Sequence, residues 1–336
     1  MTFPVEVVLD LRYAAPDDIP LLADLYVPRG IGSPPPVIVW VHGGGWRFGN
    51  RRLGPDLSRF FARSGFAMAA VDYRLSDQAT FPAQIDDLKT AIRWVRSVAK
   101  TYGLDSARVG LLGSSAGGHL SALAGLAPCE MFEPADALYL EHSSSVQAVV
   151  DGYGPTDFLQ IDSHRPPDDV VSDDPETVLL PRGMTRSAAP DSFESLLLGA
   201  PIETCPDRVG EANPITYAAQ GAPPFLILHG CSDTTVPAHQ SELLYDALAA
   251  HDAEVSLCLI DGLGHGFLNR THLDDGPARR VTLKRHEPGG GEQVEQGDHR
   301  IFAMIESFFR THVAHRTVRS IPTGASAPGL TPGTGP

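Results

Sequence analysis

The hydrophobic positions of this chain follow two patterns, and together they predict most of its strands and helices. Runs of mainly apolar, often β-branched residues occur at 37–41, 66–73, 108–113, 146–150, 225–228 and 255–260. Such unalternated runs are typical of strands covered on both faces of a sheet. Between residues 81 and 102 the apolar positions recur instead at steps of three and four, at Ile85, Leu88, Ile92, Val95 and Ala99. That spacing predicts an amphipathic helix with one buried face.

The order of these elements indicates the fold class. The chain opens with two apolar segments, 5–11 and 21–27, and the turn-rich residues 15–18 between them favour an antiparallel hairpin. Helical segments separate most of the later strands, and this alternation is typical of a doubly wound, mostly parallel sheet. We therefore predict an α/β fold built on an eight-stranded sheet.

Three segments do not follow the alternation of strands and helices. Residues 155–220 carry acidic pairs and many prolines between short apolar stretches, so we expect a small cap inserted after the sixth strand. Residues 271–298 are rich in charge and glycine and are interpreted as a surface excursion before a last helix near 301–312. The composition of 317–336, rich in Pro, Gly, Ser and Thr, predicts a flexible tail. Residues 1–316 would then form one domain.

Composition narrows the choice of partners. Lys and Arg number 26 and Asp and Glu number 41, and the formal net charge of −15 would repel nucleic acid and anionic lipid. No apolar stretch approaches the ~20 residues that span a bilayer, and residues 1–6 lack the features of a secretory signal. We expect a cytoplasmic protein with no nucleic-acid or membrane partner. The four cysteines are widely spaced, which indicates neither a zinc site nor a disulfide framework.

A candidate nucleophile lies at the end of the apolar run 108–113. Gly113-Ser114-Ser115-Ala116-Gly117 matches G-x-S-x-G, and the small and apolar residues that follow it are typical of a helix packed closely on a sheet. This pattern marks a sharp turn from strand to helix that exposes the central serine at the carboxyl edge of the sheet. We therefore predict Ser115, rather than Ser114, as the nucleophile.

Two further residues follow later strands and complete a serine hydrolase triad. Asp233 comes a few positions after the strand 225–228, and His265 comes after the strand 255–260 with a glycine on either side. Asp233 by itself would be interpreted as a turn or helix-capping residue. The order Ser115, Asp233, His265 is the one found in α/β-hydrolases, and it favours Asp233 as the acid and His265 as the base. His142, His164, His251, His286 and His299 lie in polar or helical surroundings and are interpreted as solvated.

Backbone donors for a developing oxyanion are predicted at two places. One is the N–H of Ala116, directly after the nucleophile, and the other is the glycine loop His42-Gly43-Gly44-Gly45-Trp46 after the strand 37–41. Glycines leave the N–H groups accessible because they carry no side chain. A phosphate-binding loop is the rival interpretation, but the loop lacks the lysine and spacing of a P-loop.

These motifs together resemble a known family. The glycine loop at 42–46, Val71-Asp72-Tyr73-Arg74-Leu75 with Phe81-Pro82, the serine motif at 113–119, His229-Gly230 with Asp233, and Gly264-His265-Gly266-Phe267 occur in order. The chain thus resembles the hormone-sensitive-lipase-like esterases of the α/β-hydrolase superfamily, and most closely their small-capped, bacterial feruloyl-esterase-like branch. Ser76-Asp77-Gln78-Ala79-Thr80 departs from the Pro-Glu pair that is common there.

The resemblance implies the residue roles as well as the fold. Ser115, His265 and Asp233 would form the catalytic triad of a carboxylic ester hydrolase. Gly44, Gly45 and Ala116 would form the oxyanion hole, with Gly43 as a further candidate. Trp46 and Phe48 would line the mouth of the site, while His42 would brace the glycine loop.

The expected substrate is a small-molecule ester with a short to medium acyl or an aryl group, hydrolysed through an acyl-enzyme without a metal or other cofactor. An arylformamidase or related amidase would use the same machinery and stays open. A hydrolase-fold binding protein without activity is disfavoured because all three triad members are present. A homodimer also stays open.

Overall fold

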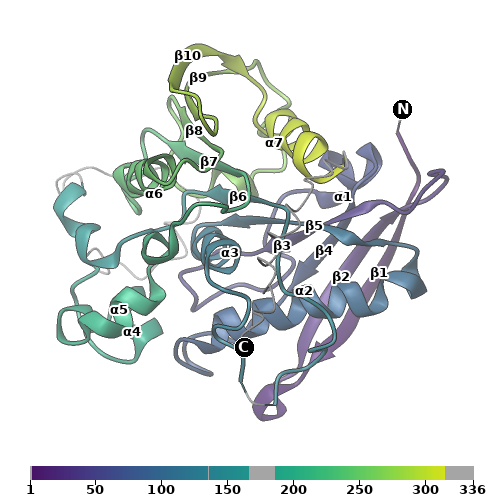
Figure 1. The fold of residues 1–336 in the computed structure, drawn as a ribbon, viewed down its shortest axis with the longest axis horizontal. Helices are drawn as coiled ribbons and strands as arrows, with labels where there is room; N and C mark the ends of the chain where they lie inside the picture. The colour runs from purple at the N-terminus through teal and green to yellow at the C-terminus, as the bar shows by residue number, and fades with distance from the viewer. Residues whose placement is uncertain (1, 135, 166–185, 315–336) are drawn as a thin grey trace, which may run out of the picture.

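A computed structural model describes residues 2–134, 136–165 and 186–314 (Figure 1). The predicted tail 317–336 and the central part of the predicted cap, 166–185, lie outside the described residues. Within the described part the strands are β1 (Val5–Ala14), β2 (Leu21–Pro28), β3 (Pro36–Val41), β4 (Ala67–Val71), β5 (Asp105–Ser114), β6 (Ala148–Gly152), β7 (Phe225–Gly230), β8 (Val255–Ile260), β9 (Arg279–His286) and β10 (Glu292–His299). The α-helices are α1 (Leu57–Phe60), α2 (Ala83–Tyr102), α3 (Ala116–Leu126), α4 (Phe193–Leu198), α5 (Pro206–Ala212), α6 (His239–Ala250) and α7 (Ile301–Phe309).

All these strands belong to one sheet, in the order β1-β2-β4-β3-β5-β6-β7-β8-β9-β10. The run from β4 to β8 is parallel, while β1, β2, β9 and β10 pair with their neighbours in antiparallel fashion. The parallel strands therefore point their carboxyl ends to one edge of the sheet, where the loops that follow them meet. This topology confirms the predicted α/β fold and its opening hairpin.

Alternating side chains of each central strand supply the two halves of the core. In β3, Val37, Val39 and Val41 belong to one buried cluster, and Ile38 and Trp40 belong to the other. Successive strand residues point to opposite faces, which explains why the run contains no polar position. Apolar residues of α2, α3 and α6 complete the first cluster, and those of α1 and α7 complete the second.

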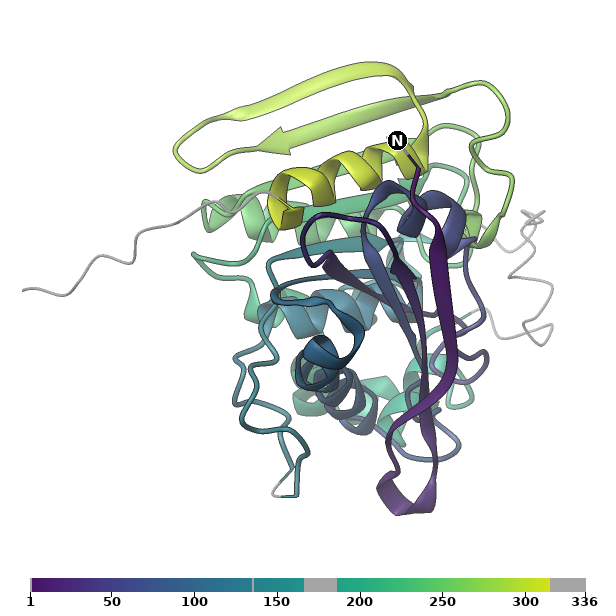
Figure 2. The same ribbon diagram turned by 90° about the vertical axis from the view of Figure 1, so that its right-hand side faces the viewer.

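The segment 271–298 corrects two predictions. It was expected to be a surface excursion beside an eight-stranded sheet, but it forms the hairpin β9–β10, and the sheet has ten strands among the described residues. Val281 and Leu283 of β9 are buried, whereas β10 is exposed along almost all of its length. Figure 2 shows this hairpin as the outermost layer beyond α7. The strand β9 is thus part of the folded core.

The segment between β6 and β7 carries α4 and α5, which lie together at one end of the molecule (Figure 1). Its position after the sixth strand is the one expected for a cap. Among the described residues, no helix is both long and apolar enough to cross a bilayer.

Candidate active site

The turn between β5 and α3 holds Ser115 in a strained conformation. Its backbone has φ 54° and ψ −120°, a region that residues other than glycine rarely occupy. The turn requires glycine on both sides of the serine. A Cβ on Gly113 would lie 2.1 Å from the carbonyl oxygen of Gly117, and a Cβ on Gly117 would lie 2.1 Å from that of Val41. Close contact between β5, β3 and α3 therefore explains the sequence of the motif.

The structure brings together the three residues expected from the order of the motifs. The hydroxyl of Ser115 donates to Nε2 of His265 at 2.8 Å, and Nδ1–H of His265 donates to Oδ2 of Asp233 at 2.7 Å. They come from the loops after β5, β7 and β8, which end at the same edge of the sheet. All three residues are buried, with exposed fractions of 7%, 2% and 6% for Ser115, His265 and Asp233. This arrangement suits nucleophilic attack by a serine with a histidine as base.

Asp233 is held as an anion by its surroundings. Burial opposes its ionisation, but the charge of His265 and hydrogen bonds from His229 and His265 outweigh burial and hold the pKa of Asp233 well below its usual value. The other carboxylate oxygen, Oδ1, accepts the backbone N–H groups of Thr235 and Val236, each at 2.9 Å. The loop after β7 therefore fixes Oδ1, while the two histidines contact Oδ2.

The glycine loop after β3 adopts a conformation that only glycine accommodates. Gly44 has φ +105°, and a Cβ there would lie 2.3 Å from the carbonyl oxygen of Phe48. Gly45 has φ +59°, and its Cβ would lie 2.7 Å from the ring of Phe193. Among the described residues, the N–H groups of Gly44, Gly45 and Ala116 make no backbone hydrogen bond outside the regular elements. Backbone N–H groups of this kind are the donors that an oxyanion hole requires.

Gly43 lies directly against the turn that carries Ser115. A Cβ on Gly43 would lie 3.0 Å from the carbonyl oxygen of Ser114 and 3.3 Å from Cβ of Ser115. This contact makes Gly43 the point at which the glycine loop touches the turn.

Trp46 lies in the core, which corrects its predicted place at the mouth of the site. Its exposed fraction is 2%, and its indole Nε1–H donates to Nδ1 of His119 at 3.2 Å. The indole ring also packs against Phe158 and edge-on against His119. The other ring nitrogen of His119 donates to the carbonyl of Ala212 at 2.8 Å, and burial lowers the pKa of His119 to about 4. Trp46 therefore anchors the glycine loop to α3.

Phe48 is exposed, and it has an aromatic partner that the sequence did not indicate. Phe48 has an exposed fraction of 38%, and its ring meets that of Phe193 edge to face at 5.9 Å between centroids. Phe193 begins α4, and its ring covers Gly45. This pair places an apolar surface directly beside the glycine loop.

The residues around His42 contact the glycine loop from its buried side. The imidazole of His42 is fully buried and stacks on Tyr73 at 4.3 Å, while the Tyr73 hydroxyl donates to the carbonyl of His42. Burial lowers the pKa of His42 to about 4, and its Nδ1–H donates to the carbonyl of Gly43. In the same motif, Asp72 accepts both the backbone N–H and the guanidinium of Arg51. His42 therefore braces the loop from within the core.

The five histidines that were interpreted as solvated are not buried, and the cysteines form no disulfide. None of His142, His164, His251, His286 and His299 is buried, and His286, for example, lies beside Asp252. The four cysteines are free; Cys258 is buried and Cys231 is exposed. Among the described residues, no group of three or more His, Cys, Asp and Glu side chains is arranged to hold a metal ion.

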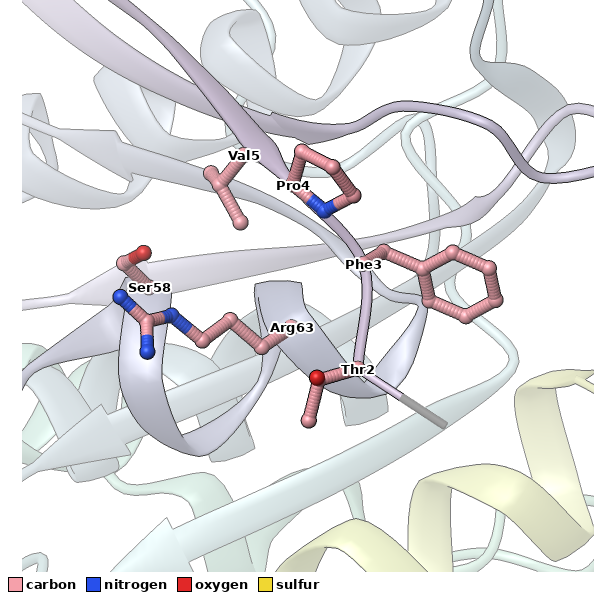
Figure 3. Close-up of a pocket in the computed structure, with 6 residues that line it drawn as sticks. All are labelled: Thr2, Phe3, Pro4, Val5, Ser58 and Arg63. Atoms are coloured by element: carbon pink, nitrogen blue, oxygen red, sulfur yellow. The ribbon is translucent and has the colours of Figure 1, made fainter.

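Figure 3 shows a surface depression that involves none of the residues discussed above. It is lined by Thr2, Phe3, Pro4, Val5, Ser58 and Arg63. These residues come from the start of the chain and from the region of α1, so the depression is separate from the loops that carry Ser115, Asp233 and His265.

The fold, with the loops that gather at this edge of the sheet, is that of an α/β-hydrolase. A family model, BD-FAE, matches residues 23–248. The chain therefore belongs to the BD-FAE family, which confirms the resemblance inferred from the motifs.

Known proteins of similar sequence and structure carry esterase names. The chain is 32% identical over 254 residues to esterase LipC of Mycobacterium tuberculosis, covering 75% of this chain and 58% of that protein. A truncated carbohydrate esterase from gut microbiota superposes with a TM-score of 0.71 at 25% identity, covering 94% of this chain and 98% of that one. An esterase of Thermogutta terrifontis with bound propionate gives a TM-score of 0.57 at 25% identity, covering 79% and 85%. The chain spans about half the length of the curated relatives that it matches.

Proposed function

We propose that this protein is a serine carboxylesterase that hydrolyses short to medium acyl or aryl esters through an acyl-enzyme. The observation that carries the proposal is the continuous hydrogen-bonded series from Ser115 through His265 to Asp233, in a buried setting. The esterase names of LipC and of the two solved structures support the same reaction class.

The first half of the reaction forms the acyl-enzyme. Oγ of Ser115 attacks the ester carbonyl carbon while its proton passes to Nε2 of His265. The carbonyl oxygen becomes negative, and the N–H groups of Gly44, Gly45 and Ala116 donate to it. Collapse of this intermediate breaks the bond to the alcohol oxygen, which leaves with the proton from His265. The acyl group is then bound to Ser115 as an ester.

The second half repeats these steps with water. His265 takes a proton from a water molecule, whose oxygen attacks the acyl carbon, and then returns the proton to Oγ of Ser115 as the acid leaves. Asp233 keeps its charge throughout, because its pKa is held low by His265 and His229 against the effect of burial. It therefore orients His265 and stabilises the positive imidazolium that forms twice in each turnover.

Two observations support a preference for small substrates. Phe193 of α4 covers Gly45 and meets Phe48, so an aromatic wall lies next to the proposed oxyanion hole. The solved Thermogutta terrifontis esterase holds propionate, a short acid. We infer that the segment 155–220 acts as a cap and limits the length of the acyl chain, and that the partner of the site is a small-molecule ester.

Hydrolysis of p-nitrophenyl esters from acetate to palmitate tests the proposal. We expect turnover of the short esters by the wild type, falling with acyl length, and a loss of several orders of magnitude in kcat for Ser115→Ala because triad members act as a unit. Circular dichroism would show that the variant is folded.

An aryl formamide measured in parallel separates the main alternative. Turnover of the formamide without turnover of any ester would favour an arylformamidase. If folded wild type hydrolyses neither, the enzymatic proposal is wrong.

A further inference from the structure

A second buried histidine lies against the acid of the triad. His229 is in the last part of β7, is fully buried, and lies four residues before Asp233. We propose that His229 is a positioning residue that fixes the Asp233 carboxylate and acts on the reaction only through it. This inference rests on the proposed function.

The contacts of His229 determine where its ring proton resides. Nε2 lies 2.9 Å from the carbonyl oxygen of Val236 and 3.2 Å from Oδ2 of Asp233, and both of these atoms are acceptors. Nε2 must therefore carry the proton, which it donates to the Val236 carbonyl and shares with Oδ2 of Asp233 as a second, longer contact. Nδ1 lies 2.7 Å from Oγ of Ser241, whose hydroxyl can donate to it. The hydroxyl on α6 thus stabilises the tautomer that the two acceptors at Nε2 require.

His229 and His265 share one oxygen of Asp233. Oδ2 accepts Nδ1–H of His265 at 2.7 Å and lies 3.2 Å from Nε2 of His229, while Oδ1 accepts backbone N–H groups. The carboxylate cannot rotate without losing several of these bonds at once. The plane in which the carboxylate accepts the hydrogen bond from His265 is therefore fixed partly by His229.

Burial makes this contact hard to replace. The side chains of His229 and Asp233 are both 0% exposed, so water cannot supply the missing donor if the imidazole is removed. The ring of Tyr153 makes T-shaped contacts with both His229 and His265, with ring centroids 6.4 Å and 4.7 Å apart. The hydrogen bond from His229 is also one of the causes that lower the pKa of Asp233. A hydrogen bond to a buried charged group is among the stronger ones in proteins.

Two substitutions distinguish this role from simple core packing. His229→Phe fills similar space but removes the donor, whereas His229→Gln can return an N–H near the position of Nε2. We expect His229→Phe to lower kcat for p-nitrophenyl acetate about 10- to 100-fold with KM nearly unchanged, because orientation of His265 matters only in the chemical steps. His229→Gln should recover most of that loss. A merely structural role predicts no such recovery and no separation of kcat from KM.

A double-mutant cycle shows whether His229 acts through Asp233. In an Asp233→Asn background, His229→Phe should cause little further loss, since the carboxylate that it positions is gone. An unchanged kcat in His229→Phe, or the same fold-loss with and without Asp233→Asn, would overturn the inference.

Ser241→Ala provides a milder variant that decides the question if circular dichroism shows His229→Phe to be unfolded. It removes only the hydroxyl that donates to Nδ1 of His229, and we expect kcat to fall about 2- to 10-fold in the wild-type background and not in Asp233→Asn. Equal losses in both backgrounds, or none in either, would contradict the role.

An inactive wild type would remove the proposed function and this inference together. An active wild type with an unaffected His229 variant overturns the inference alone.

Discussion

At the residue scale, the proposed oxyanion hole depends on positions at which a single methyl group has no room. Gly44 combines φ +105° with a backbone oxygen 2.3 Å from where its Cβ would lie. The neighbouring atom belongs to the main chain of Phe48, so relief requires the loop itself to move. A substitution here tests the geometry of the loop without touching the triad.

We predict that Gly44→Ala lowers kcat about 10²- to 10³-fold, the cost of losing one oxyanion donor. The Ser115, His265 and Asp233 side chains would remain, so the acylation step should slow without a matching rise in KM. Steady-state kinetics with p-nitrophenyl butyrate would measure the effect. Gly276→Ala is a matched control, because a Cβ at Gly276 meets nothing within 4 Å. Near wild-type kcat for Gly44→Ala would place the oxyanion elsewhere.

Single residues also show how far a sequence determines a site. Ser115, Asp233 and His265 could be predicted because each follows a strand, and parallel strands end at one edge. The buried position of the Trp46 side chain could not be predicted. It depends on a backbone φ of 55°, and no sequence pattern indicates a positive φ at a tryptophan. His229 was missed as a positioning residue because a histidine at the end of an apolar strand is usually a core residue. Its spacing of four residues before Asp233 was the available signal.

At the scale of elements, the β9–β10 hairpin shows a limit of hydrophobic patterning. In β9 only Val281 and Leu283 are apolar, and β10 contains the single apolar residue Val294. The two strands are joined by a backbone ladder and by cross-strand pairs such as Arg285 with Glu295, at 2.8 Å. A charged ribbon of this kind has no apolar run by which to predict it. Strands such as β3 could be predicted because all six of their residues are buried and the sequence therefore shows a continuous apolar run.

The two strands of the hairpin should differ sharply in their contribution to stability. We predict that Val281→Ala lowers the free energy of unfolding by about 2 kcal/mol, because it leaves a cavity in the buried cluster that β9 shares with α7. Val281 is 1% exposed, whereas Val294 is 57% exposed. Val294→Ala is the same substitution on the outer strand β10. It should therefore change the free energy of unfolding by less than about 0.5 kcal/mol. Denaturant unfolding followed by circular dichroism would measure both variants, and equal effects would contradict the assignment of β9 to the core.

At the scale of the whole molecule, the excess of acidic residues includes carboxyl groups in the interior as well as on the surface. The chain carries a formal net charge of −15, and Asp86 and Asp87 are adjacent on α2. Asp87 is bound by Arg74 at 2.9 Å, but Oδ1 of Asp86 is buried and has no hydrogen-bond partner within the described residues. Burial, together with the charge of Asp87, raises the pKa of Asp86 to about 7. The native protein therefore holds a proton at Asp86 that the unfolded chain releases.

This difference makes stability depend on pH in a predictable direction. Between the ordinary carboxyl pKa of 3.8 and the native value of about 7, the folded state binds more protons than the unfolded state. Stability therefore falls as pH rises through this window. We predict that Asp86→Asn, which carries no charge at any pH, raises the free energy of unfolding by about 1–2 kcal/mol at pH 8. The gain should largely vanish at pH 4.5, where Asp86 of the wild type keeps its proton.

Urea unfolding of wild type and variant at both pH values would measure the difference. Asp298→Asn, on the exposed strand β10, is the control for the general effect of removing one negative charge from an acidic protein. A gain for Asp86→Asn that is equal at pH 4.5 and pH 8, or no larger than that of Asp298→Asn at pH 8, would show that the buried carboxyl is not the cause. A gain confined to the higher pH would show that α2 keeps this carboxyl protonated, at a cost in stability once it ionises.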